Sequence, residues 1–161
     1  MIIVSNTTPL IGLASIQQFD LLRHVFGVLH IPQAVYQEAV ILGREAGGAK
    51  REVSTATWIK TLQVRDSLAV EVLLDEMDSG EAETIVLARE IGAEWVLMDE
   101  KKGRRKLAQL GLQYIGTMGI LLRAKQAGLI PSIRPELEKL RQQGFSVSQA
   151  VVDAVLQRAQ E

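Results

Sequence analysis

Two acidic residues, Glu81 and Asp99, stand eighteen positions apart at the two ends of one predicted helix–strand unit. Glu81 opens the segment GEAETIVLAREIG, which has helical apolar spacing, and Asp99 closes the apolar run EWVLMD. A helix that crosses back to a parallel strand returns the chain to the same edge of a sheet. We therefore expect both carboxylates at the carboxyl edge of the strands, where open α/β sheets collect their ligands.

Asn6 is expected at the same edge, because it follows the end of the first strand. Residues 2–4 are apolar and predict a buried strand, and residues 5–8 predict a polar turn into a helix. Thr8 is expected to cap that helix, with Pro9 at the first helical position.

A further acid, Glu38, is carried by the next strand and helix. Residues 28–31 predict the strand, and Pro32 predicts the start of a helix over residues 33–40. Hard divalent cations prefer carboxylate, carbonyl and water oxygens, and metal-assisted hydrolysis at phosphorus needs several such groups on one face. The candidate ligands are Asn6, Glu38, Glu81 and Asp99, with Thr7 and Thr8 as supporting residues.

Strands and helices alternate along the rest of the chain. Further helices are expected over residues 19–26, 67–77, 79–91, 101–106, 117–128, 137–141 and 146–160, and further strands over 58–64 and 112–116, with a glycine-rich break at Gly47 and Gly48. Strands separated by helices imply parallel pairing with right-handed crossovers. The sequence therefore predicts a three-layer α/β/α sandwich with a central, mainly parallel sheet. We expect a single domain over residues 1–161, with a C-terminal helical extension from about residue 131.

The composition limits the classes of function. At 161 residues, 47% hydrophobic and 23% charged, the chain resembles an ordinary globular protein. No apolar stretch approaches the ~20 residues of a membrane helix and no secretory signal is recognisable, so we expect a cytoplasmic protein without membrane attachment. The lack of cysteine excludes thiolate nucleophiles and thiolate metal sites. The net charge of −1 excludes a uniformly basic protein that coats nucleic acid, but it permits a local basic patch.

Such a basic patch directly follows Asp99. It consists of Lys101, Lys102, Arg104, Arg105 and Lys106. A cluster of this kind is commonly a solvated helix face, but its place beside the expected metal site favours phosphate contacts. Arg104 and Arg105 would bind phosphate through forked hydrogen bonds, while Lys101 and Lys102 would attract it by charge.

Four segments, spread over essentially the whole chain, carry a family resemblance. They are SNTTPLIGL, IPQAVYQEAV, GEAETIVLAREIGAEWVLMDE and LQYIGTMGILLRAKQAGLI. They resemble the PIN-domain superfamily, particularly its small prokaryotic branch related to VapC-type toxins, in which the last two acids lie about as far apart as Glu81 and Asp99. The resemblance implies metal ligands at Asn6, Glu38, Glu81 and Asp99, of which the three acids would be catalytic.

The resemblance also implies an activity and partners. The protein would be an endoribonuclease that uses Mg²⁺ or Mn²⁺ to cleave single-stranded RNA. It would be the toxin of a toxin–antitoxin pair, with a small antitoxin protein as its partner, and it would form a homodimer. The phosphate contacts expected of the basic patch would then be contacts with RNA.

The sequence departs from the family at Asn6, where most PIN nucleases carry an aspartate. An amide oxygen can bind a cation but brings no negative charge, so the alternative is a catalytically silent PIN-fold module that binds RNA or protein. Glu83 and Glu100 are reserve acids near the expected site. A phosphatase or aspartyl-phosphate site is a third alternative, with Asp99 as its nucleophile.

Each candidate residue also has a structural explanation. Asp78 and Glu81 fit a capping box at the start of a helix, and Asp99 fits an Asx turn. Glu38 flanks an apolar stripe, and Asn6 could bond the turn backbone. The ordered match of all four positions favours a shared site.

Overall fold

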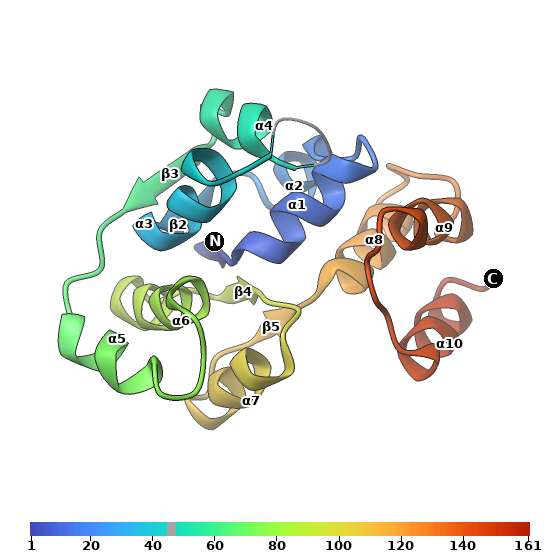
Figure 1. Ribbon diagram of the computed structural model, residues 1–161. Coiled ribbons are helices and arrows are strands. Elements are labelled where there is room, and N and C mark those ends of the chain that lie inside the picture. Colours follow the sequence, from blue (N-terminus) through green and yellow to red (C-terminus); the bar gives the residue numbers. More distant parts are fainter. Residues whose placement is uncertain (45–47) are drawn as a thin grey trace.

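A central parallel sheet organises the protein (Figure 1). The computed structural model describes residues 1–44 and 48–161, and this part of the chain contains a five-stranded sheet with the order β3-β2-β1-β4-β5. The strands are β1 (Ile3–Ser5), β2 (Leu29–Pro32), β3 (Ile59–Leu62), β4 (Trp95–Leu97) and β5 (Tyr114–Ile115). Each pair of neighbouring strands is parallel.

Helices cover both faces of this sheet. One core cluster draws on α1 (Thr7–Ser15), α2 (Asp20–Phe26), α3 (Gln33–Tyr36) with its π-helical continuation η1 (Gln37–Ile41), α4 (Lys50–Thr55) and α8 (Thr117–Gln126). The other core cluster draws on α5 (Ser67–Leu73), α6 (Ser79–Ile91) and α7 (Lys101–Gln109). Neighbouring strand residues alternate between the two clusters, with Ile3 and Leu97 in the first and Val4 and Val96 in the second. The predicted three-layer α/β/α sandwich is confirmed.

The central strand β1 places the first polar turn at the carboxyl edge of the sheet. Ser5 lies opposite Leu97 in the β1–β4 register. The backbone N–H of Asn6 donates to the carbonyl of Leu97 at 3.0 Å. This hydrogen bond connects the residue after β1 to the last residue of β4. The polar turn after β1 and the connection after β4 therefore start side by side.

Helix α1 begins two residues earlier than predicted, at Thr7 instead of Pro9. Asn6 has an extended backbone and precedes the first helical residue, Thr7, so the expected cap at Thr8 was wrong. The sheet bond of Asn6 explains the shift, because the chain turns into the helix immediately after that bond. The Thr8 hydroxyl instead donates to a carboxylate oxygen of Glu100.

Other boundaries also differ from the sequence prediction. Strand β4 ends at Leu97, two residues before the predicted end, so Asp99 lies in the connection between β4 and α7. Helix α4 was not predicted, because its six residues bury only Val53 and show no helical apolar repeat. Of the predicted glycine break, Gly48 lies two residues before α4, whereas Gly47 lies outside the described residues.

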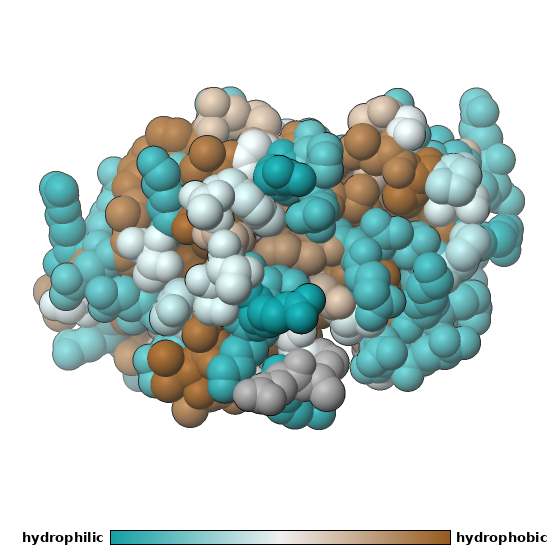
Figure 2. Space-filling view, turned by 90° about the horizontal axis from the view of Figure 1, so that it is seen from above, coloured by the Kyte–Doolittle hydropathy of each residue, from teal (hydrophilic) through white to brown (hydrophobic). Residues whose placement is uncertain are grey.

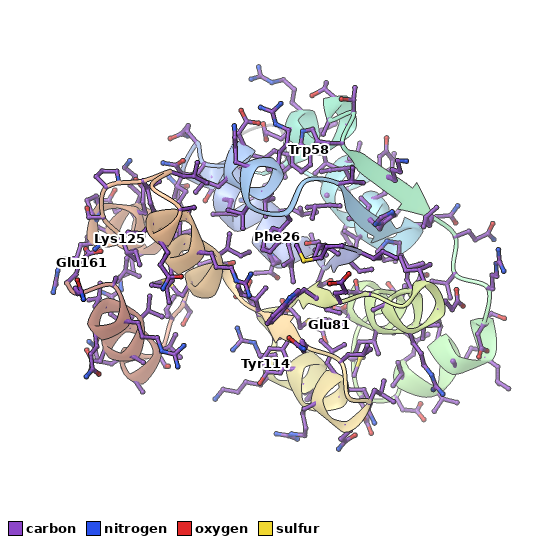
Figure 3. The ribbon with its side chains drawn as sticks, turned by 180° about the vertical axis from the view of Figure 1, so that it is seen from behind. Phe26, Trp58, Glu81, Tyr114, Lys125 and Glu161 are labelled. Carbon is purple, nitrogen blue, oxygen red and sulfur yellow. The ribbon has the colours of Figure 1, made fainter. Side chains whose placement is uncertain are left out.

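Two further helices, α9 (Arg134–Gln142) and α10 (Gln149–Arg158), follow α8 along one side of the molecule (Figure 1). They lie in the segment predicted as a helical extension, and α10 packs against α8. Lys125 of α8 and Glu161 face each other in Figure 3, with 3.0 Å between Nζ and Oε2. None of the described helices combines the length and apolar character needed to cross a membrane.

Candidate functional site

Asn6 is buried at the carboxyl edge of the sheet, with only 3% of its surface exposed. Its amide nitrogen Nδ2 donates to Oε2 of Glu100 at 2.9 Å and lies 3.6 Å from the sulfur of Met98. The amide oxygen Oδ1 is buried and has no hydrogen-bond partner. Because an unpaired buried polar atom costs free energy, this oxygen is a favourable position for a ligand that accepts its lone pairs.

Glu38 reaches the same edge from the π-helical segment η1. Its Oε2 accepts a hydrogen bond of 2.8 Å from the hydroxyl of Thr7. Its carboxylate also lies against Gly80, where an added methyl group would stand 2.2 Å from Oε1. Burial raises the pKa of Glu38, an effect that the bond from Thr7 opposes and the charge of Asp78 reinforces. Glycine at position 80 thus makes room for this carboxylate.

Glu81 lies in the first turn of α6, at the helix end nearest β4 (Figure 3), and is 9% exposed. Asp78 caps this helix by accepting a 2.9 Å hydrogen bond from the backbone N–H of Glu81. Burial, together with the negative charges of Asp78, Glu100 and Glu38, raises the pKa of Glu81 from 4.5 to about 7. The nearby charge of Lys102 acts in the opposite direction.

Glu100 completes this group of acids. Its two carboxylate oxygens accept hydrogen bonds from Nδ2 of Asn6 and from the hydroxyl of Thr8. Its charge acts on the carboxyl groups of both Glu38 and Glu81. Glu100 therefore faces the turn after β1, although it was ranked only as a reserve acid from the sequence.

Asp99, its neighbour, is bound elsewhere. Its Oδ1 accepts a 2.8 Å hydrogen bond from the backbone N–H of Thr117, and its Oδ2 accepts a 2.7 Å bond from the Thr117 hydroxyl. The guanidinium of Arg104 lies 3.9 Å from Oδ1. Burial raises the pKa of Asp99, and the two bonds from Thr117 oppose that effect.

The basic residues of α7 divide into exposed and internal side chains. Lys101, Lys102 and Arg105 are exposed at the start of the helix. Arg104 is half-buried, donates from Nε to the carbonyl of Met98 at 2.8 Å, and stacks its guanidinium 5.3 Å from the ring centre of Tyr114. Three of the four predicted RNA-binding side chains are thus free to meet a ligand, whereas Arg104 is held within the protein.

The chain matches the family model of the PIN domain over residues 2–161. It belongs to the PIN-domain family. This match confirms the resemblance at the level of the superfamily, and the PIN domain is a nuclease-type fold. A comparison with curated proteins gave no significant match.

In this PIN domain, the residues around Asn6 suit a hard divalent cation. Glu38, Glu81 and Glu100 supply negative charge, and Oδ1 of Asn6 supplies a buried oxygen without a partner. Their mutual repulsion disfavours the fully ionised state, and a cation would relieve it. Within residues 1–44 and 48–161, no three histidine, cysteine or acidic side chains are already drawn together into a preformed metal cluster.

Two residues of this PIN-domain site were not among the predicted site residues. Asp78 was seen only as a helix cap, and its charge acts on both Glu38 and Glu81. Glu100 was recognised as an acid beside Asp99, but spacing alone does not tell which of two adjacent side chains faces Asn6. The hydrogen bond from Asn6 to Glu100 identifies it.

Proposed function

We propose that this PIN domain is a Mg²⁺- or Mn²⁺-dependent endoribonuclease that cleaves single-stranded RNA. The observation that carries the proposal is the unpartnered, buried Oδ1 of Asn6 beside the carboxylates of Glu38, Glu81 and Glu100. This combination has the donor chemistry of a magnesium or manganese site.

Asn6, Glu38 and Glu81 would hold the cation, together with an acid of the β4–α7 connection, which carries Asp99 and Glu100. A bound cation would supply an activated water and stabilise the charge that develops on the leaving oxygen. The surrounding residues keep the ligands in place. Thr7 orients Glu38 through its hydroxyl, and Asp78 fixes the first turn of α6 beneath Glu81.

The exposed cations at the start of α7 would hold the RNA. Lys101, Lys102 and Arg105 follow Glu100 in the sequence, and the positive charge of Lys102 lowers the pKa of Glu81. Side chains of this type bind phosphates through charge and hydrogen bonds. The RNA backbone would thereby pass directly over the carboxylates.

We further propose that the protein acts as the toxin of a toxin–antitoxin pair, with a small antitoxin as partner, and forms a homodimer. Two exposed apolar surfaces support a partner protein. One borders a groove of about 660 Å³ between α5, α6 and α7 and includes Leu68 and Val72, which are 68% and 63% exposed. The other includes Ile41 and Leu42 after α3, and hydrophobic patches are visible on the face shown in Figure 2.

The alternative function is a catalytically silent module that binds RNA or protein. The replacement of the usual acid by Asn6 favours it, because the amide adds no charge to a cation site. Both functions are compatible with the exposed basic residues, so only a test of chemistry separates them.

The experiment is cleavage of a mixed single-stranded RNA pool with Mg²⁺, Mn²⁺ or EDTA. Glu81→Gln is prepared in parallel, with Glu138→Gln as the matched control, because Glu138 carries an exposed carboxylate that pairs with Arg141 on α9. The proposal expects metal-dependent cutting by the unaltered protein and by Glu138→Gln, and its loss in Glu81→Gln. Cutting that persists in Glu81→Gln would indicate a contaminant, and no cutting in any metal would favour the silent module.

A further inference from the structure

We propose that Glu100, and not Asp99, is the acid through which the β4–α7 connection binds the metal, and that Asp99 is a positioning residue that anchors helix α8. This inference rests on the proposed metal-dependent function. It assigns different roles to two adjacent acids, of which Asp99 is the one at the family spacing.

Asp99 already satisfies the start of α8. Helix α8 begins at Thr117 and is preceded by Gly116, which has no side chain with which to cap the helix. Asp99 replaces the missing cap, because its two oxygens accept the N–H and the hydroxyl of Thr117. Asp99 therefore joins the β4–α7 connection to the start of α8.

The side chains of Asp99 and Arg104 pack closely against the backbone of Gly116. A methyl group added at Gly116 would stand 1.9 Å from Nη2 of Arg104 and 2.8 Å from Oδ1 of Asp99. The guanidinium of Arg104 is itself fixed by the carbonyl of Met98. The positive charge beside Asp99 belongs to this anchor, with Nη2 of Arg104 3.9 Å from Oδ1.

Glu100 has the opposite surroundings. Its hydrogen-bond partners are both neutral: Asn6 directly follows β1, and Thr8 lies in the first turn of α1. Thr7, which lies between Asn6 and Thr8, donates from its hydroxyl to Glu38 at 2.8 Å, so consecutive residues after β1 hold both Glu38 and Glu100. The unpartnered Oδ1 of Asn6 belongs to the same amide whose nitrogen donates to Glu100. The side chain of Asn6 therefore keeps its own oxygen close to the carboxylate of Glu100.

Amide variants separate the two roles with little change of shape. In Glu100→Gln the amide oxygen can still accept from Asn6, so the turn is retained while the charge is removed. In Asp99→Asn the amide oxygen can still accept from the N–H of Thr117, so the anchor is retained while the charge is removed. Asp99→Ala removes the anchor itself.

The test is Mn²⁺ binding by each purified variant, measured from the electron paramagnetic resonance signal of free Mn²⁺, with a thermal melt in EDTA. We expect Glu100→Gln to weaken Mn²⁺ binding at least about tenfold, and Asp99→Asn to change it by less than about threefold. Asp99→Ala is expected to lower the melting temperature and to expose the Thr117 amide to hydrogen exchange, and Asp99→Asn is expected to rescue both.

Three results would overturn the inference. If Asp99→Asn weakens Mn²⁺ binding as much as Glu100→Gln does, Asp99 is a ligand, and the proposed function stands without this assignment. If Glu100→Gln binds Mn²⁺ normally, Glu100 is not a ligand. If the folded, unaltered protein binds no Mn²⁺, the proposed function and the inference fail together.

Discussion

Asn6 donates from Nδ2 to Oε2 of Glu100 at 2.9 Å, and this single bond determines which way the amide faces. Because the nitrogen is turned to the carboxylate, the oxygen Oδ1 is left buried and without a partner. The bond also brings an acid of the β4–α7 connection to the end of β1. An amide at this position therefore joins two parts of the site that an aspartate would push apart.

Replacing Asn6 by aspartate should have opposite effects in the absence and presence of metal. Without a cation, Asn6→Asp places a second carboxylate against Glu100, so we expect a lower melting temperature in EDTA. With Mn²⁺, the added charge should tighten binding by about tenfold or more and increase RNA cleavage. Calorimetric titration with Mn²⁺ and melts with and without EDTA check both effects. Unchanged affinity and unchanged cleavage would contradict the view of Asn6 as a weakened ligand.

The raised pKa of Glu81 should make the metal-free protein less stable as the pH rises. The folded state holds this proton up to about pH 7, whereas an unfolded chain releases it near 4.5, so stability present below 4.5 is lost as the pH rises through 7. Glu81→Gln removes this dependence and should gain about 1–2 kcal/mol at pH 8, with solvent screening taken into account. Denaturant unfolding in EDTA at pH 5 and pH 8 measures the difference. Parallel changes in Glu81→Gln and the unaltered protein would contradict the prediction.

Gly80→Ala should destabilise the protein, because the added methyl group would clash with the carboxylate of Glu38. Alanine normally stabilises a helix relative to glycine by about 1 kcal/mol, but here its methyl group would stand 2.2 Å from Oε1 of Glu38. We expect a loss of about 1–3 kcal/mol of unfolding free energy and weaker Mn²⁺ binding. The matched background is Glu38→Ala, in which Gly80→Ala should become neutral or stabilising. A double-mutant cycle without coupling between the two positions would exclude this contact.

The exposed cations of α7 should determine how RNA binding depends on salt. Replacing Lys101, Lys102 or Arg105 by glutamine is expected to reduce the slope of log K against log salt by about 0.7 for each phosphate that is no longer neutralised. Arg104→Gln is the informative comparison, because this side chain is held by Met98 and Tyr114. It should lower the melting temperature and leave the slope unchanged. Fluorescence anisotropy with labelled RNA in EDTA measures the slopes, and a reduced slope in Arg104→Gln would show that this residue also binds RNA.

The sequence predicts the parts of the fold that carry strong local signals. Helix α6 has the predicted bounds, 79–91, because Asp78 caps its start and Gly92 ends it in a left-handed conformation. The parallel sheet follows from the alternation of apolar strands and helices. Helix α4 carries neither a cap nor an apolar repeat, so its six residues could not be recognised.

The candidate site shows a similar limit. Spacing along the chain brings Asn6, Glu38 and Glu81 to one edge. Asn6 follows β1, Glu81 lies in the first turn of α6, and Glu38 lies in the helical segment that follows β2. It does not say which of Asp99 and Glu100 faces the site, since β4 ends at Leu97 and the alternation of a strand no longer applies beyond it. Only the three-dimensional contacts with Thr117 and Asn6 distinguish the two acids.

The most direct test of the account is a crystal structure with Mn²⁺ present, recorded where manganese scatters anomalously. The account predicts an anomalous peak about 2.2 Å from Oδ1 of Asn6, with carboxylate oxygens of Glu38 and Glu81 in the same coordination shell. A peak at this place would establish the metal site independently of any contaminating nuclease. A Mn²⁺-containing crystal with no peak beside Asn6, or with its peak elsewhere, would contradict the central claim.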